Sequence, residues 1–129
     1  MSAEDSTDPR DRVTTVTVLG AGSWGTALAM QLDRAGSVPI LWDWDAAHME
    51  ALRLARCNEK FLPGHRLPDS LVLEPDLESA VRAADEILIV VPSHAFVSVI
   101  TQIGPWLKPG QGIAWACKGL EPGTGQFLH

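Results

Sequence analysis

Short runs of β-branched and apolar residues alternate along the chain with longer segments in which apolar residues recur every three or four positions. The short runs predict strands at 13–19, 38–42, 71–73, 87–91 and 113–117. The longer segments predict helices at about 24–35, 46–56, 76–84 and 95–107. The uninterrupted apolar run at 87–91 is typical of a parallel strand covered on both faces. The alternation therefore predicts an α/β fold with a parallel sheet.

Residues at the ends of the predicted helices fit these boundaries. Gly36 stands where the first helix would end, as a C-cap glycine. Asp45 and Asp76 precede the second and third helices as N-cap residues, and Ser93 is a candidate cap for the fourth. The stretch 58–69 contains two prolines and a glycine and predicts an irregular loop, long enough to be functional.

Length and composition narrow the class of protein. A chain of 129 residues with 46% hydrophobic and 20% charged residues fits one globular domain. The net charge of −6 argues against nucleic acid as a partner, because phosphate backbones are bound by clustered Lys and Arg. Residues 1–12 lack the apolar core of a signal peptide and predict a disordered tail. No apolar run approaches the roughly 20 residues of a membrane span, so we expect no membrane insertion.

The two cysteines, Cys57 and Cys117, have no spacing that indicates a metal site. Lone thiols in a chain without a secretory signal fit a reducing compartment, so we expect a cytoplasmic protein. Their simplest interpretation is that of small buried hydrophobic residues.

The motif that carries chemistry is Gly20-Ala21-Gly22-Ser23-Trp24-Gly25, a G-x-G-x-x-G sequence between the first predicted strand and the first predicted helix. That context is typical of a dinucleotide-binding Rossmann fold. Gly20 would allow the tight turn out of the strand, and Gly22 would let the backbone approach a pyrophosphate. Gly25 would let the helix pack closely on the strand. The sequence therefore predicts a Rossmann-type doubly wound parallel sheet that binds NADPH or NADH.

The end of the second predicted strand bears on the choice of cofactor. Asp43 stands roughly 20 residues after the glycines, where a carboxylate usually binds the ribose 2′-hydroxyl. Trp44 is a candidate for stacking on adenine. Two other interpretations remain open, a solvated loop acid for Asp43 and a packing residue for Trp44. No Arg or Lys stands between Trp42 and Ala47 to bind a 2′-phosphate, so these residues do not favour NADPH over NADH.

Two further strand ends place polar residues at the same predicted edge of the sheet. Ser93 and His94 follow the fourth strand, where a helix cap and a structural histidine compete with cofactor contact. Lys118 follows the fifth strand and can place positive charge beside a substrate phosphate or carbonyl. An ordinary surface lysine is the alternative interpretation.

Several motifs together resemble the bacterial NAD(P)-dependent glycerol-3-phosphate dehydrogenases. They occur in order from about Val16 to Glu121 and thus cover nearly the whole chain beyond the tail. They are 20–29 (GAGSWGTALA), Leu41-Trp42, 58–63 (N-x-x-F-L-P), 91–94 (VPSH) and 118–121 (KGLE). The KGLE element, together with the glycine loop and the VPS sequence, is specific, because Rossmann proteins in general share only the glycine loop.

The resemblance implies reversible reduction of dihydroxyacetone phosphate to sn-glycerol 3-phosphate, a precursor of phospholipids. It implies that Ser23 and Trp24 bind the cofactor, that Trp44 lies near its adenosine, and that Lys118 touches cofactor and substrate. The family often has Gly or Ala followed by Arg or His at the positions of Asp43 and Trp44. This departure leaves NADPH and NADH both open.

The family continues into a helical substrate domain that carries the catalytic lysine. We therefore expect 13–129 to be the N-terminal dinucleotide-binding domain only, with no catalytic residue of its own and no activity alone. The full-length protein is expected to be a homodimer. Two alternatives stay open: the first half of another two-domain dehydrogenase, such as a 6-phosphogluconate or hydroxyacid type, and a stand-alone NAD(P)-sensing module.

Overall fold

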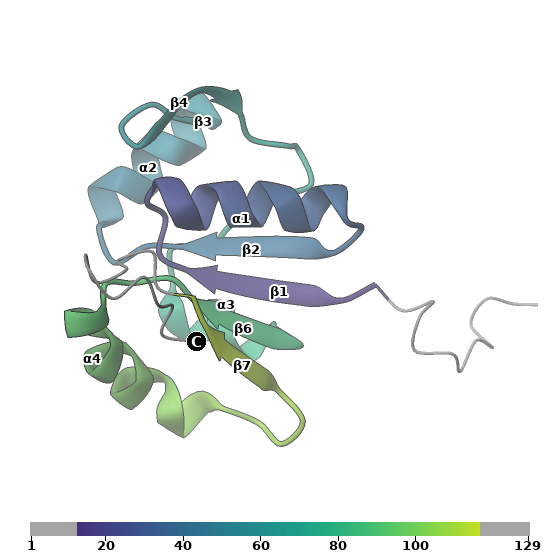
Figure 1. Ribbon diagram of the computed structural model, residues 1–129, viewed down its shortest axis with the longest axis vertical. Helices are drawn as coiled ribbons and strands as arrows, with labels where there is room; N and C mark the ends of the chain where they lie inside the picture. Colours follow the sequence, from purple (N-terminus) through teal and green to yellow (C-terminus); the bar gives the residue numbers. More distant parts are fainter. Residues whose placement is uncertain (1–12, 117–129) are drawn as a thin grey trace, which may run out of the picture.

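The computed structural model describes residues 13–116, which form a single α/β unit (Figure 1). Strands and helices alternate along most of this range, as the hydrophobic pattern predicts. The elements are β1 (Thr15–Leu19), α1 (Ser23–Arg34), β2 (Val38–Trp42), α2 (Ala46–Ala55), β3 (Cys57–Asn58), β4 (Leu62–Arg66), β5 (Val72–Leu73), α3 (Leu77–Arg82), β6 (Glu86–Ile89), α4 (Ser93–Ile103), the 3-10 helix η3 (Gly104–Trp106) and β7 (Gly112–Trp115).

The main sheet is parallel throughout, in the order β5-β2-β1-β6-β7. The chain starts at the centre with β1, moves outward through β2 to β5, and returns to place β6 on the other side of β1. The strand order therefore reverses between β1 and β6, as in the doubly wound fold that binds dinucleotides. The predicted fold class, a Rossmann-type doubly wound parallel sheet, is confirmed.

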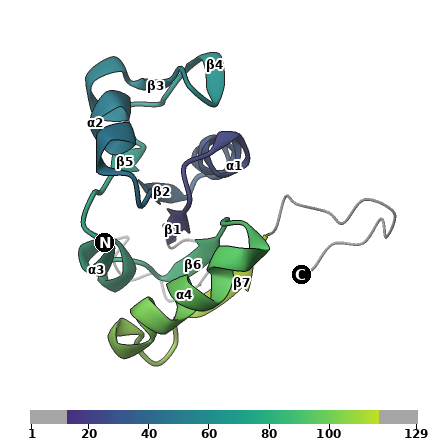
Figure 2. The same cartoon turned by 90° about the vertical axis from the view of Figure 1, so that its left-hand side faces the viewer.

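Hydrophobic cores cover both faces of the sheet, because side chains alternate along each strand. On one face, Val18 and Leu41 pack with residues of α1 and α2. On the other face, Leu19 and Ile40 pack with residues of α3 and α4. Figure 2 shows α1 on one side of the strands and α4 on the other. Burial on both faces explains why the strands are nearly continuous apolar runs.

The predicted helix boundaries are largely confirmed. The Asp45 carboxylate accepts hydrogen bonds from two N–H groups of the first turn of α2, and the Asp76 carboxylate caps α3 by accepting one from the Ser79 N–H. Gly36 follows α1 with φ +97°, a left-handed conformation that favours glycine. The expectation that Ser93 caps the fourth helix is wrong. α4 starts at Ser93 itself, with Pro92 in the cap position and no side-chain cap.

Two predictions about irregular segments need correction. The stretch 58–69, expected as a loop, contains most of a small antiparallel hairpin formed by β3 and β4. Its strands are short and β4 contains a proline and a glycine, which usually break strands, so the pattern did not reveal it. The helix expected to reach residue 107 ends at Ile103 and continues as the 3-10 helix η3. Among residues 13–116, no helix is both long and apolar enough to cross a membrane.

Candidate functional site

A cleft of about 230 Å³ lies at the carboxyl ends of β1, β2 and β6, where the strand order reverses. Ligands of open parallel sheets bind at this position. Four segments line the cleft: the glycine loop, the residues that follow β2, the end of β6 and the turn of the β3–β4 hairpin. The lining residues are Gly20, Gly22, Asp43, Trp44, Asp45, His48, Lys60, Phe61, Val90, Val91 and Pro92.

Two glycines of the loop are required by close backbone approaches. Gly20 has φ +123°, and a Cβ there would lie 2.3 Å from the carbonyl oxygen of Val90. A Cβ on Gly25 would lie 1.8 Å from the carbonyl oxygen of Gly20. Both distances are far below any real carbon–oxygen contact. The structure thus confirms the tight turn predicted at Gly20 and the close packing of helix on strand predicted at Gly25.

Gly22 differs from these two, because nothing lies within 4 Å of the position its Cβ would occupy. It is the N-cap residue of α1, without a side-chain cap, and the first turn contains no acidic residue. The first N–H groups of a helix have no acceptor within the helix, and the helix dipole places positive charge there. The loop therefore offers an anion both space and hydrogen-bond donors.

Asp43 holds the glycine loop against the end of β2. Its Oδ1 accepts a hydrogen bond from the Ala21 N–H at 2.8 Å, and its Oδ2 accepts one from the Asp45 N–H at 3.1 Å. This structural role was not predicted, and it shows that Asp43 is more than a solvated loop acid. A carboxylate has about four lone-pair sites, so two backbone bonds leave capacity for a ribose hydroxyl.

The two tryptophans predicted near the cofactor are both exposed. Trp44 lines the cleft with 78% of its surface exposed, so its interpretation as a packing residue is wrong. Trp24, in the first turn of α1, is 38% exposed. An exposed indole at the mouth of a cleft has a free face for stacking on a base. Ser23, also predicted to bind the cofactor, is the first residue of α1. Lys118, another predicted binding residue, lies outside the described residues.

Comparison with known proteins identifies the family. The sequence model of the N-terminus of NAD-dependent glycerol-3-phosphate dehydrogenase matches residues 15–129. The chain belongs to this family. It is 53% identical over 114 residues to a glycerol-3-phosphate dehydrogenase (NAD(P)+) of Photobacterium profundum, covering 88% of this chain and 34% of that protein. A relative from Xanthomonas euvesicatoria is also 53% identical, with 88% and 33% covered.

Solved structures of the family agree with the fold. The glycerol-3-phosphate dehydrogenase of Coxiella burnetii superimposes with a TM-score of 0.79 at 40% identity, covering 84% of this chain and 33% of that one. The enzyme of Saccharomyces cerevisiae gives 0.72 at 27% identity, covering 85% and 35%. The chain thus spans about a third of the length of the relatives it matches.

Two buried polar residues near the family's glycine loop were not predicted as part of the site. Asn58 is fully buried, and its Nδ2 donates to the carbonyl oxygen of Ala21 at 3.0 Å and to Thr26 Oγ1 at 2.8 Å. His48 Nε2 lies 2.9 Å from the same Ala21 oxygen. Asn58 belongs to the N-x-x-F-L-P motif, which was noted only for resemblance. Nothing in the sequence around His48, apart from its place in a predicted helix, indicated a role in the site.

The structure also brings a basic residue to the cleft. Lys60 lines it from the turn of the hairpin, with its Nζ 5.1 Å from the centroid of the Phe61 ring. The Phe61 ring meets the His48 ring edge-on at 5.1 Å. The residues directly after β2 contain no cation for a 2′-phosphate, and Lys60 was not predicted because it reaches the cleft from another element, the hairpin turn.

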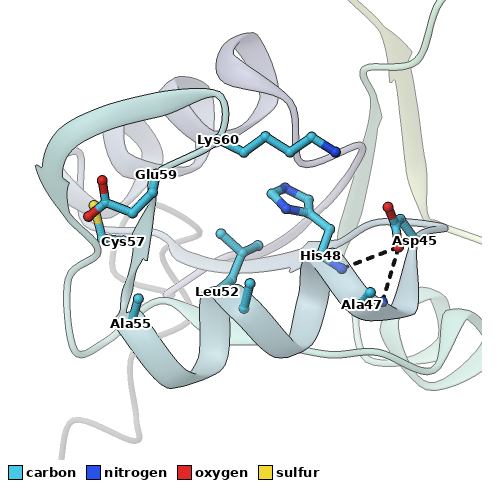
Figure 3. Close-up of a pocket in the computed structure, with 9 residues that line it drawn as sticks. Asp45, Ala47, His48, Leu52, Ala55, Cys57, Glu59 and Lys60 are labelled. Carbon is cyan, nitrogen blue, oxygen red and sulfur yellow. Dashed lines mark hydrogen bonds between the residues drawn. The ribbon is translucent and has the colours of Figure 1, made fainter.

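A second cavity of about 320 Å³ lies beside the cleft, between α2 and the hairpin turn (Figure 3). Figure 3 shows Lys60 reaching across it above His48, with Cys57 at the far end. Cys57 is a free thiol of intermediate exposure, so its interpretation as a buried hydrophobic residue is wrong. The other residues that line this cavity are Asp45, Ala47, Ala51, Leu52, Ala55 and Glu59.

Proposed function

We propose that the cleft binds NADPH or NADH, and that the chain is the cofactor-binding part of a glycerol-3-phosphate dehydrogenase. The longer protein would reversibly reduce dihydroxyacetone phosphate to sn-glycerol 3-phosphate for phospholipid synthesis. The observation that carries the proposal is the glycine loop. Gly20 and Gly25 are fixed by contact, whereas Gly22 faces open space at the uncapped start of α1. Family membership supports the same reaction.

In this proposal the dinucleotide lies in the cleft with its pyrophosphate at the glycine loop and its adenosine at the end of β2. The pyrophosphate lies against Gly22 and the first turn of α1, including Ser23, Trp24 and Gly25. A hydroxyl of the adenosine ribose donates a hydrogen bond to the Asp43 carboxylate, and the adenine stacks on Trp44. This orientation is supported by the exposure of Trp44 and by the open space at Gly22.

When bound, the cofactor supplies a hydride that passes between its nicotinamide C4 and C2 of the substrate. The described residues bind and orient the dinucleotide, and Lys118 is proposed to contact both cofactor and substrate. We assign the catalytic acid/base to the part of the relatives that this chain does not span. Residues 13–129 should therefore bind dinucleotide without reducing dihydroxyacetone phosphate. A homodimer in the cytoplasm is proposed for the longer protein, on the resemblance alone.

Titration of the chain with NADH and NADPH, followed by tryptophan fluorescence, tests this function. We expect saturable quenching, because Trp24 and Trp44 lie beside the proposed site. Trp44→Phe should remove much of the signal, whereas Trp106→Phe in η3, at the far end of α4, should not. A folded chain that showed no saturable binding of either dinucleotide would refute the proposal.

Exchange of the carboxylate after β2 should change the preference between the two cofactors. Asp43→Arg is expected to raise affinity for NADPH relative to NADH, because a guanidinium pairs with a 2′-phosphate and a carboxylate repels it. The variant also loses two backbone hydrogen bonds, so both affinities should fall while their ratio changes. Asp43→Asn, which keeps an acceptor for the Ala21 N–H without the charge, is the control. An unchanged ratio in Asp43→Arg would place Asp43 outside the ribose site.

A further inference from the structure

The peptide group between Ala21 and Gly22 lies at the centre of the glycine loop, and its oxygen is held from two sides. Asn58 Nδ2 donates to this oxygen at 3.0 Å, and His48 Nε2 lies 2.9 Å from it. A carbonyl oxygen only accepts hydrogen bonds, so His48 must carry its proton on Nε2. Asn58 is fully buried and His48 is 6% exposed, so water does not compete for either bond.

Because the peptide group is planar, fixing the Ala21 oxygen also fixes the direction of the Gly22 N–H. No peptide bond among residues 13–116 is cis. In a trans peptide the C=O and N–H bonds point in opposite directions. Because the Ala21 oxygen faces Asn58 and His48, the Gly22 N–H points away from these two side chains. Gly22 itself lines the cleft. None of the described residues accepts a hydrogen bond from this N–H.

We propose that Asn58 and His48 are positioning residues, which hold the Ala21–Gly22 peptide so that the Gly22 N–H is aimed at the pyrophosphate of the dinucleotide. This inference rests on the proposed function. Neither side chain needs to touch the cofactor, because the planar peptide transmits their effect. Pre-orientation matters because a donor that is already aimed loses little entropy when the anion binds.

Asn58 is placed to connect three segments. Besides the Ala21 oxygen, its Nδ2 donates to Thr26 Oγ1 of α1 at 2.8 Å. Its Oδ1 accepts a hydrogen bond from the Phe61 N–H at 3.1 Å, which closes the turn of the hairpin. One amide thus uses both donors and an acceptor to join the glycine loop, α1 and the hairpin. The hairpin turn, which also lines the cleft, is thereby fixed relative to the donors for the pyrophosphate.

The competing explanation is that Asn58 and His48 only stabilise the fold. Comparing the binding of NADH with that of adenosine distinguishes this explanation from the proposed positioning role. NADH contains the pyrophosphate. Adenosine contains only the ribose and adenine, which bind at Asp43 and Trp44 in the proposed site. Loss of the aimed N–H should weaken NADH binding and spare adenosine. General loosening of the fold should weaken both. Amide NMR titrations of the 129-residue chain measure both affinities and follow the Gly22 N–H signal directly.

The variants are Asn58→Ala, His48→Ala and His48→Gln, with Thr17→Val as the matched control. Gln is included because its amide nitrogen reaches about as far as His Nε2 and also donates. Thr17 is fully buried, and its hydroxyl donates to the carbonyl oxygen of Ala80 at 2.6 Å, on the α3 face of the sheet. Thr17→Val therefore removes the same kind of buried bond away from the cleft.

We expect Asn58→Ala and His48→Ala to weaken NADH binding by about tenfold or more, as for loss of one hydrogen bond to a charged group. Adenosine affinity should stay unchanged, and the Gly22 signal should shift less on NADH addition. His48→Gln should recover most of the NADH affinity, and Thr17→Val should lose none.

Equal losses for NADH and adenosine, or unchanged NADH binding in both alanine variants, would overturn the inference while leaving the proposed function in place. A wild-type chain that is folded and binds no NADH would overturn the proposed function and this inference together.

Discussion

Gly25→Ala is expected to disrupt the fold of the chain and to abolish dinucleotide binding. The new methyl group would lie 1.8 Å from the carbonyl oxygen of Gly20, which is backbone and has no rotamer to relieve the clash. Relief requires α1 to move away from β1. That movement would pull Ala29 and Met30 of α1 out of the core on that face of the sheet. We expect a loss of about 3 kcal/mol or more in the free energy of unfolding, at the upper end of overpacking effects.

Urea denaturation of Gly25→Ala and wild type measures this loss, with Gly104→Ala as the control. Gly104 has φ −47° and open space where its Cβ would be, so alanine should leave the chain as stable or raise its stability by up to about 1 kcal/mol. Both variants add one methyl group to a glycine, and only the surroundings differ. Similar melting of the two variants would show that the close contact of α1 with the loop does not exist in solution.

The features that sequence reasoning predicted well depend on neighbours in the chain. The strand 38–42 was predicted with its observed bounds, because an apolar run of that length between a C-cap glycine and an N-cap aspartate has few other interpretations. The mechanical roles of Gly20 and Gly25 were also predictable. A G-x-G-x-x-G sequence between a strand and a helix imposes a short-range geometry whatever the rest of the fold does.

The features that were missed depend on contacts between distant segments. Asn58 lies 37 positions from Ala21 and His48 lies 27 positions from it. Only the packing of α2 and the hairpin against the loop brings these side chains to one carbonyl oxygen. The second role of Asp43 has a similar origin. It faces the Ala21 N–H because β1 and β2 pair with Leu19 opposite Trp42, a register that no local pattern specifies.

The hairpin was missed for a further reason. Its pairing is short and irregular, and the turn is closed by a side chain, since Asn58 accepts a hydrogen bond from the Phe61 N–H. Periodicity detects elements that repeat, whereas this element is held by single specific contacts. Lys60 was missed as a cleft residue for the same reason, because the hairpin alone carries it there.

Gly22→Ala is expected to leave the fold intact and to remove most of the dinucleotide affinity. Its φ of −79° and ψ of −165° suit alanine, and the methyl group would meet no protein atom within 4 Å. The loss in stability should not exceed about 1 kcal/mol, the usual difference between N-cap residues. In the proposed site, however, that methyl group occupies the space through which the pyrophosphate approaches the N–H groups of the loop. We expect NADH to bind at least about tenfold more weakly, a loss of about 1.4 kcal/mol.

Gly22→Ala and Gly25→Ala together separate the two functions of the loop. Urea denaturation should show that Gly22→Ala is about as stable as wild type, unlike Gly25→Ala. Fluorescence titration should show that both variants bind NADH more weakly than wild type. Adenosine, which has no phosphate, should still bind Gly22→Ala as it binds wild type, because Asp43 and Trp44 are unaffected. Full NADH affinity in a folded Gly22→Ala chain would mean that the pyrophosphate does not approach the loop at Gly22. The open space at that position would then have no bearing on cofactor binding, and the central observation behind the proposed function would be lost.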